Sequence, residues 1–483
     1  MLPLVSAARL GELAGRLSDD RPPLYAALAT RLQLLVADGR LPVGIRLPAE
    51  RDLAAVLHVS RATVTSAYGR LREDGWADAR QGSGTWTRLP AGPALGSWVP
   101  SPVAPGVIDL AHAAPPAPPQ VSAAFAAALS DLPRLLPGHG YAPHGLPELR
   151  ARIADRFAAR GLPTTVEQVL LTGGALHALS LVLGVLAGPG DGVLVEDPSY
   201  PNALDLVRSQ GPVLVPVAFN AADPDAAVRE LTRTARSSRP RAAYLVPDFA
   251  NPTGLLLDEA HRRRLAVGLE QAGTVTVVDE TMVETALDIA APLPFAAAAR
   301  PSATVTIGSM SKAFWGGLRL GWLRAEVDIV QRAAQALART NLSLPVLEQL
   351  AACHLLDAAD EVLPAYRARL RASREALVTG LRLTLPDWEV PVPPGGLVLW
   401  CRLPAGPSSS ALAAAAERHG LRLAAGPRFA AGSGFDNRLR LPYTAAVNVV
   451  EDAVARLGRL VEEVAGKRAP GRAAAVPAER LVI

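Results

Sequence analysis

At 483 residues, the chain is longer than one ordinary domain of roughly 100–200 residues, so we expect two or three domains. Its composition, 49% hydrophobic and 19% charged, is typical of a globular protein and excludes a disordered chain. Apolar runs are too short to span a membrane and the first residues lack signal-peptide features, so we expect a cytoplasmic protein with no membrane partner. Cys353 and Cys401 lie far apart in sequence, which predicts buried, inert thiols and no disulfide or metal site.

The excess of positive charge lies near the N-terminus. Residues 21–88 contain ten Arg against six acidic residues, and this surplus equals the net charge of +4 of the whole chain. A positive surface on a small domain is what neutralisation of nucleic-acid phosphates requires. Solvation of helix surfaces by the same arginines is the alternative.

The N-terminal segment shows the pattern of a helix-turn-helix. Apolar residues repeat at helical spacing over residues 24–38, and two shorter helices are expected over 49–57, after Pro48, and over 60–73. A three- or four-residue turn between such helices defines the motif. Two short strands are then expected to close on residues 81–85, as in a wing.

Residues near the start of the second short helix are candidates for DNA contact. Ser60 is a natural N-cap, and the first helical turn after it offers Arg61 and Thr63 to DNA. Arg61 can reach a base edge or a phosphate, whereas Arg51 on the preceding helix more naturally positions the backbone.

These segments, GIRLPAERDLAAVLHVSRATVTSAYGRLREDGW and QGSGT, closely resemble the GntR-type winged helix. The resemblance covers nearly all of residues 21–88. It implies binding of double-stranded operator DNA by Arg51, Ser60, Arg61, Thr63, Gln81 and Gly82, with Arg46 and Thr65 as further candidates.

A Pro- and Gly-rich linker, residues 89–107, separates this domain from the rest of the chain. Over residues 108–465 β-rich runs alternate with helical segments, which predicts an α/β domain with a mostly parallel sheet. The expected strands include VLLTGG, DGVLVED, PVLVPVAF, AAYLVPDF, TVTVVDE and TVTIGS. Residues 466–483 are polar and rich in Ala and Pro, and we expect a disordered tail there.

Lysine usage gives a clue that does not depend on any family. Of the 49 basic residues only Lys312 and Lys467 are lysines, so the composition favours Arg wherever charge alone is needed. Lys467 lies in the expected tail, whereas Lys312 follows an expected strand. Only an amine that can lose its proton forms an imine, which predicts Schiff-base chemistry at Lys312. A surface lysine retained by chance is the alternative.

Other residues supply the groups that a pyridoxal phosphate site needs. Asp279 ends an apolar strand, where its carboxylate could pair with a pyridinium nitrogen or simply cap the next helix. Asn251 can donate to a phenolic oxygen, although NPTG also reads as an ordinary turn. Tyr200 can lie over the ring, or it can be a packing residue.

Groups that could hold a phosphate and a carboxylate complete the set. Gly174 and Ala175 open a helix directly after a strand, so bare N–H groups and the helix dipole can bind a phosphate. Ser309, Ser311 and Arg319 could complete that phosphate site. Arg440 offers a bidentate partner for the carboxylate of an amino compound, against the alternative of a surface arginine on a strand.

The chain order of these groups resembles fold-type I aminotransferases across residues 108–465. The resemblance implies that Lys312 holds the cofactor as a Schiff base and that Asp279, Asn251, Tyr200 and Arg319 bind its ring nitrogen, phenolic oxygen, ring face and phosphate. Arg440 matches the carboxylate-binding arginine. Members of the family usually carry a tyrosine shortly after the ring aspartate, but Glu280, Thr281 and Met282 stand here. Thr281 could supply a shorter hydroxyl.

The two resemblances in this order look like the MocR/GabR type of GntR regulator, with a winged helix followed by a PLP-dependent transferase fold. In that type, an amino compound or the cofactor itself changes the affinity for DNA. The resemblance also implies a homodimer. A working aminotransferase with an appended DNA-binding domain is the competing hypothesis, and the absent tyrosine shifts the expected role from catalysis toward sensing.

Overall fold

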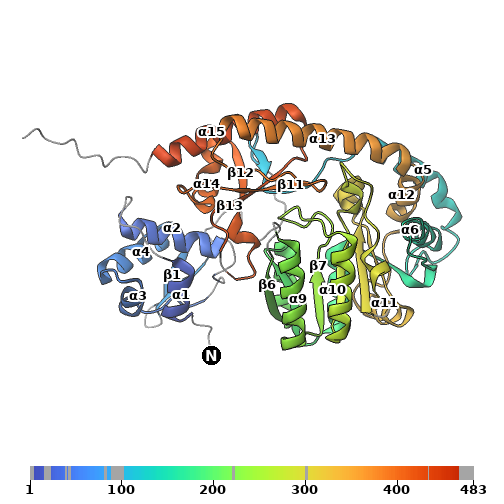
Figure 1. Cartoon of the computed structure of the whole chain (residues 1–483), viewed down its shortest axis with the longest axis horizontal. Helices are drawn as coiled ribbons and strands as arrows, with labels where there is room; N and C mark the ends of the chain where they lie inside the picture. Colours follow the sequence, from blue (N-terminus) through green and yellow to red (C-terminus); the bar gives the residue numbers. More distant parts are fainter. Residues whose placement is uncertain are drawn as a thin grey trace, which may run out of the picture. The chain divides into compact units, whose positions relative to one another are not determined.

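The structure is a computed structural model. It describes residues 5–15, 23–37, 41, 45–80, 84–88, 103–219, 223–299, 303–432 and 434–466. Contacts divide the chain into two units (Figure 1). The smaller unit combines the first 99 positions with residues 405–420 and the part of the chain from 456 onward, and the larger unit contains residues 100–404 and 421–455.

The N-terminal part of the smaller unit consists of helices and a two-stranded sheet. Its elements are α1 (Ala7–Ala14), α2 (Leu24–Ala37), α3 (Glu50–Leu57), α4 (Arg61–Glu73), β1 (Ala77–Arg80) and β2 (Gly84–Thr87). The strands pair antiparallel, with Ala77 opposite Thr87. The helices expected from the sequence are therefore confirmed, and α3 and α4 form the helix-turn-helix.

The core of this part begins before residue 21, where the sequence placed the start of the domain. Leu10 and Leu13 on α1 are buried together with Leu28 and Leu32 on α2 and Val64 on α4. The side of the short helix α1 that carries Leu10 and Leu13 faces the other helices. The linker residues 89–102, the wing residues Gln81 and Gly82, and the tail from 467 lie outside the described residues.

A seven-stranded sheet forms the centre of the larger unit, in the order β4-β10-β9-β8-β7-β5-β6. Strand β10 runs antiparallel to both of its neighbours, and the other neighbouring strands pair parallel. The expected mostly parallel sheet is confirmed. Its strands are β4 (Val169–Thr172), β5 (Gly192–Asp197), β6 (Val213–Ala218), β7 (Ala242–Leu245), β8 (Val275–Asp279), β9 (Thr304–Ser309) and β10 (Gly321–Arg324).

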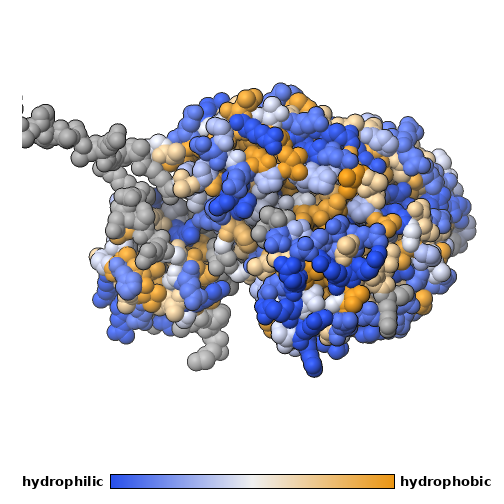
Figure 2. Space-filling model, viewed as in Figure 1, coloured by the Kyte–Doolittle hydropathy of each residue, from blue (hydrophilic) through white to orange (hydrophobic). Residues whose placement is uncertain are grey.

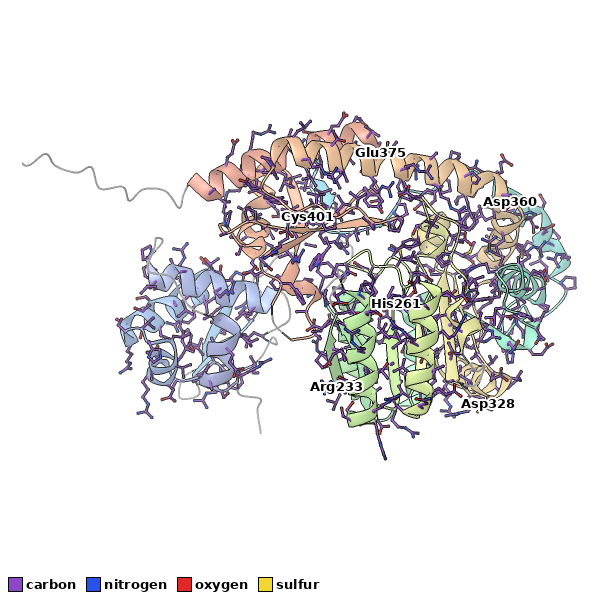
Figure 3. All side chains as sticks on the ribbon, in the orientation of Figure 1. Arg233, His261, Asp328, Asp360, Glu375 and Cys401 are labelled. Atoms are coloured by element: carbon purple, nitrogen blue, oxygen red, sulfur yellow. The ribbon has the colours of Figure 1, made fainter. Side chains whose placement is uncertain are left out.

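Amphipathic helices cover this sheet. They include α7 (Ala175–Leu186), α8 (Pro201–Gln210), α9 (Pro224–Ser238), α10 (Glu259–Gln271) and α11 (Val327–Asn341). On α9, Leu231 and Ala235 join the apolar core of the sheet, while Arg233 points away from it (Figure 3). Hydrophilic residues accordingly gather over α9 and α10 in the surface view (Figure 2). Further helices are α5 (Gln120–Asp131), α6 (Pro147–Ala159) and α12 (Val346–Asp357).

A second, four-stranded sheet in the larger unit has the order β11-β13-β12-β3. Its strands are β3 (Ile108–Leu110), β11 (Val398–Arg402), β12 (Leu421–Ala425) and β13 (Arg438–Pro442). Strand β3 pairs parallel with β12, so residues just after the linker lie beside residues more than 300 positions later. The remaining helices are α13 (Ala359–Thr384), α14 (Ser409–Ala416) and α15 (Val447–Gly466).

Both cysteines are buried and unpaired, as expected. Burial raises the pKa of Cys353 to about 11 and that of Cys401, on β11 (Figure 3), to about 12. Both thiols therefore stay protonated at neutral pH. Within the described ranges, no helix combines the length and apolarity needed to cross a bilayer.

Candidate cofactor site and DNA-binding surface

Ser60 starts helix α4 as the sequence predicts. Its Oγ accepts a hydrogen bond from the N–H of Thr63 over 3.0 Å, and its backbone is extended, as at other N-caps. Thr65 donates to Oε2 of Glu50 on α3 over 2.7 Å. These two contacts fix the start of α4 and its orientation against α3.

The arginines at this end of the smaller unit reach into solvent. The Arg61 side chain is 74% exposed and lies 3.5 Å from Glu50, while Arg51 is 83% exposed beside Asp52. Arg46 lies next to the second wing strand, since a Cβ built on Gly84 would be 3.0 Å from its Nε. Exposed arginines therefore lie on α3, at the start of α4 and beside the second wing strand. Gln81 and Gly82, the other expected contacts, fall outside the described residues.

Lys312 occupies the first turn after strand β9, in a short π-helical segment, Ser311–Trp315. Its Nζ donates to the carbonyl of Ala113 over 2.7 Å. Tyr366 on α13 donates to the Lys312 carbonyl over 2.7 Å, so the backbone at this position is also held. The lysine is thus anchored at the C-terminal end of a central strand, where parallel sheets place their ligand sites.

The electrostatic surroundings of Lys312 favour the neutral amine. Burial and the nearby Arg440 guanidinium lower the pKa of Lys312 to about 8, and Asp279 opposes this shift. An unprotonated amine is the form that attacks an aldehyde. The amine is therefore prepared for imine formation close to neutral pH.

Asp279 ends strand β8, where two protein groups donate to its carboxylate. The phenol of Tyr244 donates to Oδ2 over 2.9 Å, and the N–H of Thr281 donates to Oδ1 over 2.9 Å. Burial raises the pKa of Asp279, and the side chain and N–H of Thr281, the Tyr244 phenol and Lys312 oppose that rise. The carboxylate is therefore buried, and it also accepts a hydrogen bond from the backbone that follows β8.

Tyr244 was not among the residues expected from the sequence. It sits inside the apolar run AAYLV of β7 and looks like a core residue. The available signal was a single phenol within a fully buried strand, since buried hydroxyls usually have a hydrogen-bond partner. Which partner it has depends on the order of the strands.

Arg440 on β13 is buried, with 1% of its surface exposed, so it is not a surface arginine. Its Nη1 donates to Oδ1 of Asn251 over 3.2 Å, and its Nη2 donates to the Ala111 carbonyl. The guanidinium also lies over the Phe429 ring, 4.8 Å from the centroid. Burial lowers the pKa of Arg440 to about 10, but the group remains charged at neutral pH.

Gly174, Arg319 and the two serines gather around the N-terminus of α7 and the end of β9. Gly174 precedes α7 with φ 111°, and a Cβ there would be 3.6 Å from Nη2 of Arg319. Arg319 donates to the Gly173 carbonyl over 2.9 Å. Ser309 donates to Ser311 over 2.9 Å.

Two more residues border this group. His177, in the first turn of α7, accepts from the Gly173 N–H over 3.0 Å, and burial together with Arg319 lowers its pKa. It was not singled out from the sequence. Tyr200 precedes α8, and burial raises its pKa to about 12, with Asp279 adding to the rise while Arg440 and Arg319 oppose it. Tyr200 is therefore close enough to Asp279, Arg440 and Arg319 for their charges to change its pKa.

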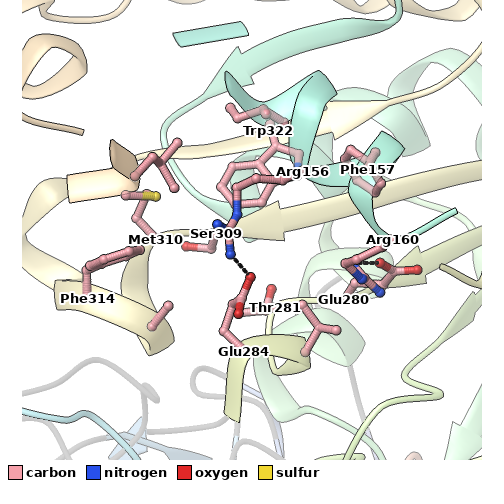
Figure 4. A pocket seen from close by; sticks show the side chains of 14 residues that line it. Arg156, Phe157, Arg160, Glu280, Thr281, Glu284, Ser309, Met310, Phe314 and Trp322 are labelled. Carbon is pink, nitrogen blue, oxygen red and sulfur yellow. Dashed lines mark hydrogen bonds and ion pairs between the residues drawn. The ribbon is translucent and has the colours of Figure 1, made fainter. Parts of the chain in front are cut away.

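A small cavity of about 40 Å³ lies beside these residues (Figure 4). Thr281 and Ser309 line it, together with residues of α6 and α12. Its wall contains an ion pair between Arg160 and Glu280 at 2.9 Å and another between Arg156 and Glu284.

The comparison with protein families decides the identity of the larger unit. Residues 120–457 match the family described as aminotransferase class I and II, and residues 24–86 match bacterial regulatory proteins of the gntR family. The chain belongs to the aminotransferase class I and II family. It is also a GntR-type regulator by architecture, with a DNA-binding winged helix fused to an aminotransferase-like domain. This aminotransferase fold binds pyridoxal phosphate.

Similar proteins include both enzymes and regulators. The 2-aminoadipate transaminase of Thermus thermophilus is 33% identical over 340 residues, covering 68% of this chain and 81% of the relative. The HTH-type pyridoxine biosynthesis transcriptional regulator PdxR of Corynebacterium glutamicum is 28% identical over 427 residues, covering 85% and 89%. A crystal structure of LysN, an alpha-aminoadipate aminotransferase from Thermus thermophilus complexed with N-(5'-phosphopyridoxyl)-L-leucine, superposes with a TM-score of 0.68 at 30% identity, covering 74% of this chain and 93% of LysN.

The groups around Lys312 fit pyridoxal phosphate in this aminotransferase-like domain. An amine with a lowered pKa lies near a buried carboxylate and a buried guanidinium. Gly174 has no side chain that could cap the N-terminus of α7, and Arg319 lies beside it. Aldehyde, pyridine nitrogen and phosphate each find a group of the matching chemistry in this set.

Proposed function

We propose that this chain is a pyridoxal phosphate-dependent transcription regulator, in which an amino compound or the cofactor itself binds the aminotransferase-like domain and changes the affinity for operator DNA. The observation that supports it is that one polypeptide carries both the charged set around Lys312 and an exposed, capped recognition helix. A ligand changes DNA affinity only if it binds two conformations of the protein unequally.

In this proposal, Lys312 attaches the cofactor covalently and Asp279 pairs with its ring nitrogen. Asn251 donates to the phenolic oxygen and Tyr200 covers the ring face, with Thr281 as a second hydroxyl near the phenolic oxygen. The phosphate binds to Gly174, Ala175, Ser309, Ser311 and Arg319. Bound pyridoxal phosphate supplies an electron sink that weakens bonds at the carbon next to the amino group of a substrate.

Arg440 gives the site its preference for a ligand. A buried guanidinium that keeps its charge at neutral pH favours an opposite charge, and a carboxylate matches its planar geometry. The proposed effector is therefore a small compound with an amino group, which can react at Lys312, and a carboxylate, which pairs with Arg440. A regulator that senses only the cofactor would not need this arginine.

The proposed DNA contacts come from the start of α4 and its surroundings. Arg61 and Thr63 reach base edges, Arg51 and Ser60 position the phosphate backbone, and Arg46, Thr65, Gln81 and Gly82 add contacts. We further propose that the protein is a homodimer. We also propose that it acts in the cytoplasm, where a bacterial regulator binds chromosomal DNA. Two linked DNA-binding domains bind paired half-sites more tightly than one.

An active aminotransferase is the second candidate function. It is favoured by the 33% identity with the 2-aminoadipate transaminase and by the intact charged set around Lys312. Sustained turnover with a panel of amino donors and 2-oxo acids would support the enzyme. A single half-reaction that stalls would support the regulator.

Operator binding tests the proposal directly. DNA from the region upstream of the chain's own gene and its neighbours is titrated with the protein, without cofactor, with PLP, and with PLP plus amino compounds. We expect the Kd to change at least about fivefold on addition of a ligand, which corresponds to a coupling of about 1 kcal/mol. The Lys312→Ala variant should bind DNA in the cofactor-free state but lose this response. A Kd that no ligand changes would reject the proposal.

A further inference from the structure

Tyr244 and Asp279 face each other across neighbouring parallel strands. On β7 and β8, Tyr244 pairs in register with Val277, and Asp279 lies two residues further along on the same face. The phenol reaches along this face to Oδ2 of Asp279 over 2.9 Å. The contact is therefore built into the order of the strands, not into a loop.

The surroundings make Tyr244 a permanent donor. Only 1% of its surface is exposed, and burial together with the negative charge of Asp279 raises the pKa of Tyr244 well above its ordinary value. The phenol therefore keeps its proton at neutral pH. A donor that cannot ionise always favours the charged form of the carboxylate it contacts.

Asp279 needs such help because it is buried. Burial alone raises the pKa of its carboxyl. The neighbouring carboxyl on β5, Glu196, is also buried, and its pKa is raised to about 8, so it does not help to stabilise the Asp279 anion. Lys312 and the N–H of Thr281 support the anion from one side, and Tyr244 supports it from the strand behind.

We infer that Tyr244 is a positioning residue, which keeps the Asp279 carboxylate ionised and oriented so that it holds the pyridine nitrogen of pyridoxal phosphate protonated. This inference rests on the proposed assignment of Asp279 to that nitrogen. The expected family tyrosine would follow Asp279 and reach the phenolic oxygen. Tyr244 instead acts at the nitrogen end of the ring, through the aspartate and without touching the cofactor.

The test compares Tyr244→Phe with Tyr443→Phe. Tyr443 is a matched control, because it is equally buried and its phenol donates to the Gly395 carbonyl over 3.0 Å. Each variant loses one phenolic hydroxyl group, and with it one buried hydrogen bond. Both are loaded with PLP carrying ¹⁵N in the ring, and the ¹⁵N chemical shift and the Kd for PLP are measured.

For Tyr244→Phe, we expect the ¹⁵N signal to move from the protonated toward the unprotonated position and the Kd for PLP to rise about tenfold, since a hydrogen bond to a charged group is lost. Tyr443→Phe should change neither. A folded Tyr244→Phe protein with wild-type ¹⁵N shift and Kd would overturn the inference and leave Tyr244 as a packing residue.

Two further measurements separate the possible failures. If borohydride traps no PLP on the wild-type protein, the proposed function is rejected, whatever Tyr244 does. If Tyr244→Phe does not fold, 3-fluorotyrosine placed at position 244 keeps the shape of the side chain and makes the phenol a stronger donor. PLP binding should then be at least as tight as in the wild type, and weaker binding with an unprotonated ring nitrogen would contradict the inference.

Discussion

Arg440 donates a hydrogen bond to Asn251 over 3.2 Å and thereby links strand β13 of the four-stranded sheet to the loop that follows β7 of the seven-stranded sheet. Arg440 also donates to the Ala111 carbonyl and lies over the face of Phe429. Burial lowers its pKa to about 10, although Tyr200 and Asp109 act on its charge as well and oppose that shift. A planar carboxylate ligand would match the geometry of this guanidinium.

Changing Arg440 to Gln should separate the response to amino acids from cofactor binding. Arg440→Gln removes the charge and the planar pair of donors, so the apparent affinity for amino acids should fall at least about tenfold while PLP is retained. Titrations that follow the absorbance of the bound cofactor measure both. The Arg440→Lys control keeps the charge and should fall in between. Equal affinities of wild type and Arg440→Gln would exclude a carboxylate contact here.

The pH dependence of covalent attachment should follow the pKa of Lys312. At pH 8, an amine with a pKa of about 8 is about half unprotonated, compared with about 0.3% at the ordinary pKa of 10.5. The rate of PLP attachment to the apo protein should therefore rise up to about pH 8 and level off above about pH 9. Stopped-flow absorbance measures this rate. A rate that continues to rise tenfold per pH unit up to pH 10 would contradict the lowered pKa.

Lys312→Ala provides the control for this profile. Without the amine, borohydride should trap no PLP on the protein at any pH, and mass spectrometry of wild-type peptides should place the adduct at Lys312. An adduct at another position in the variant would show that the assignment of the lysine is wrong.

Charge at the start of α4 should matter more for DNA than charge at its end. Arg61→Ala should weaken operator binding about tenfold or more and reduce the salt dependence of binding by about one phosphate contact. Arg70→Ala is the matched control, because Arg70 lies on the same helix but pairs with Asp74 over 3.3 Å at the far end. Fluorescence anisotropy at two salt concentrations measures both variants. Similar losses for the two would argue against α4 as the recognition helix.

Ser60 has two separable roles, as helix cap and as neighbour of a phosphate. Ser60→Ala removes the acceptor for the Thr63 N–H and should destabilise the first turn of α4 by about 1 kcal/mol, so its amides should exchange hydrogen about fivefold faster. Ser60→Asp keeps a capping oxygen and should keep the protection, but its negative charge should weaken DNA binding. Unchanged DNA affinity in Ser60→Asp would remove Ser60 from the interface.

The sequence alone located those site residues whose chemistry is unusual for their position. Lys312 was conspicuous because this chain otherwise uses Arg, and Asp279 because it ends an apolar strand. The carboxyl ends of parallel strands meet at one edge, so the mostly parallel sheet brings the residues that follow β7, β8 and β9 to the same edge. Lys312, Asp279, Arg440 and Tyr200 lie close enough to influence one another's charge.

The sequence could not supply contacts that depend on strand order or on pairing between distant segments. Tyr244 reads as a core residue until β7 is known to lie beside β8. Strand β10 is only four residues long and runs against its neighbours, so no periodicity marked it. Helix α1 was missed for a similar reason, since its apolar side becomes meaningful only against α2.

The segment directly after the linker is held both by a sheet and by residues of the candidate cofactor site. Strand β3 fixes it to the four-stranded sheet, and within the next three residues the carbonyls of Ala111 and Ala113 accept hydrogen bonds from Arg440 and Lys312. A ligand that occupies the Lys312 amine takes the donor away from Ala113, and a carboxylate at Arg440 competes with Ala111. Ligand chemistry at these two side chains would therefore replace hydrogen bonds that hold the segment following β3.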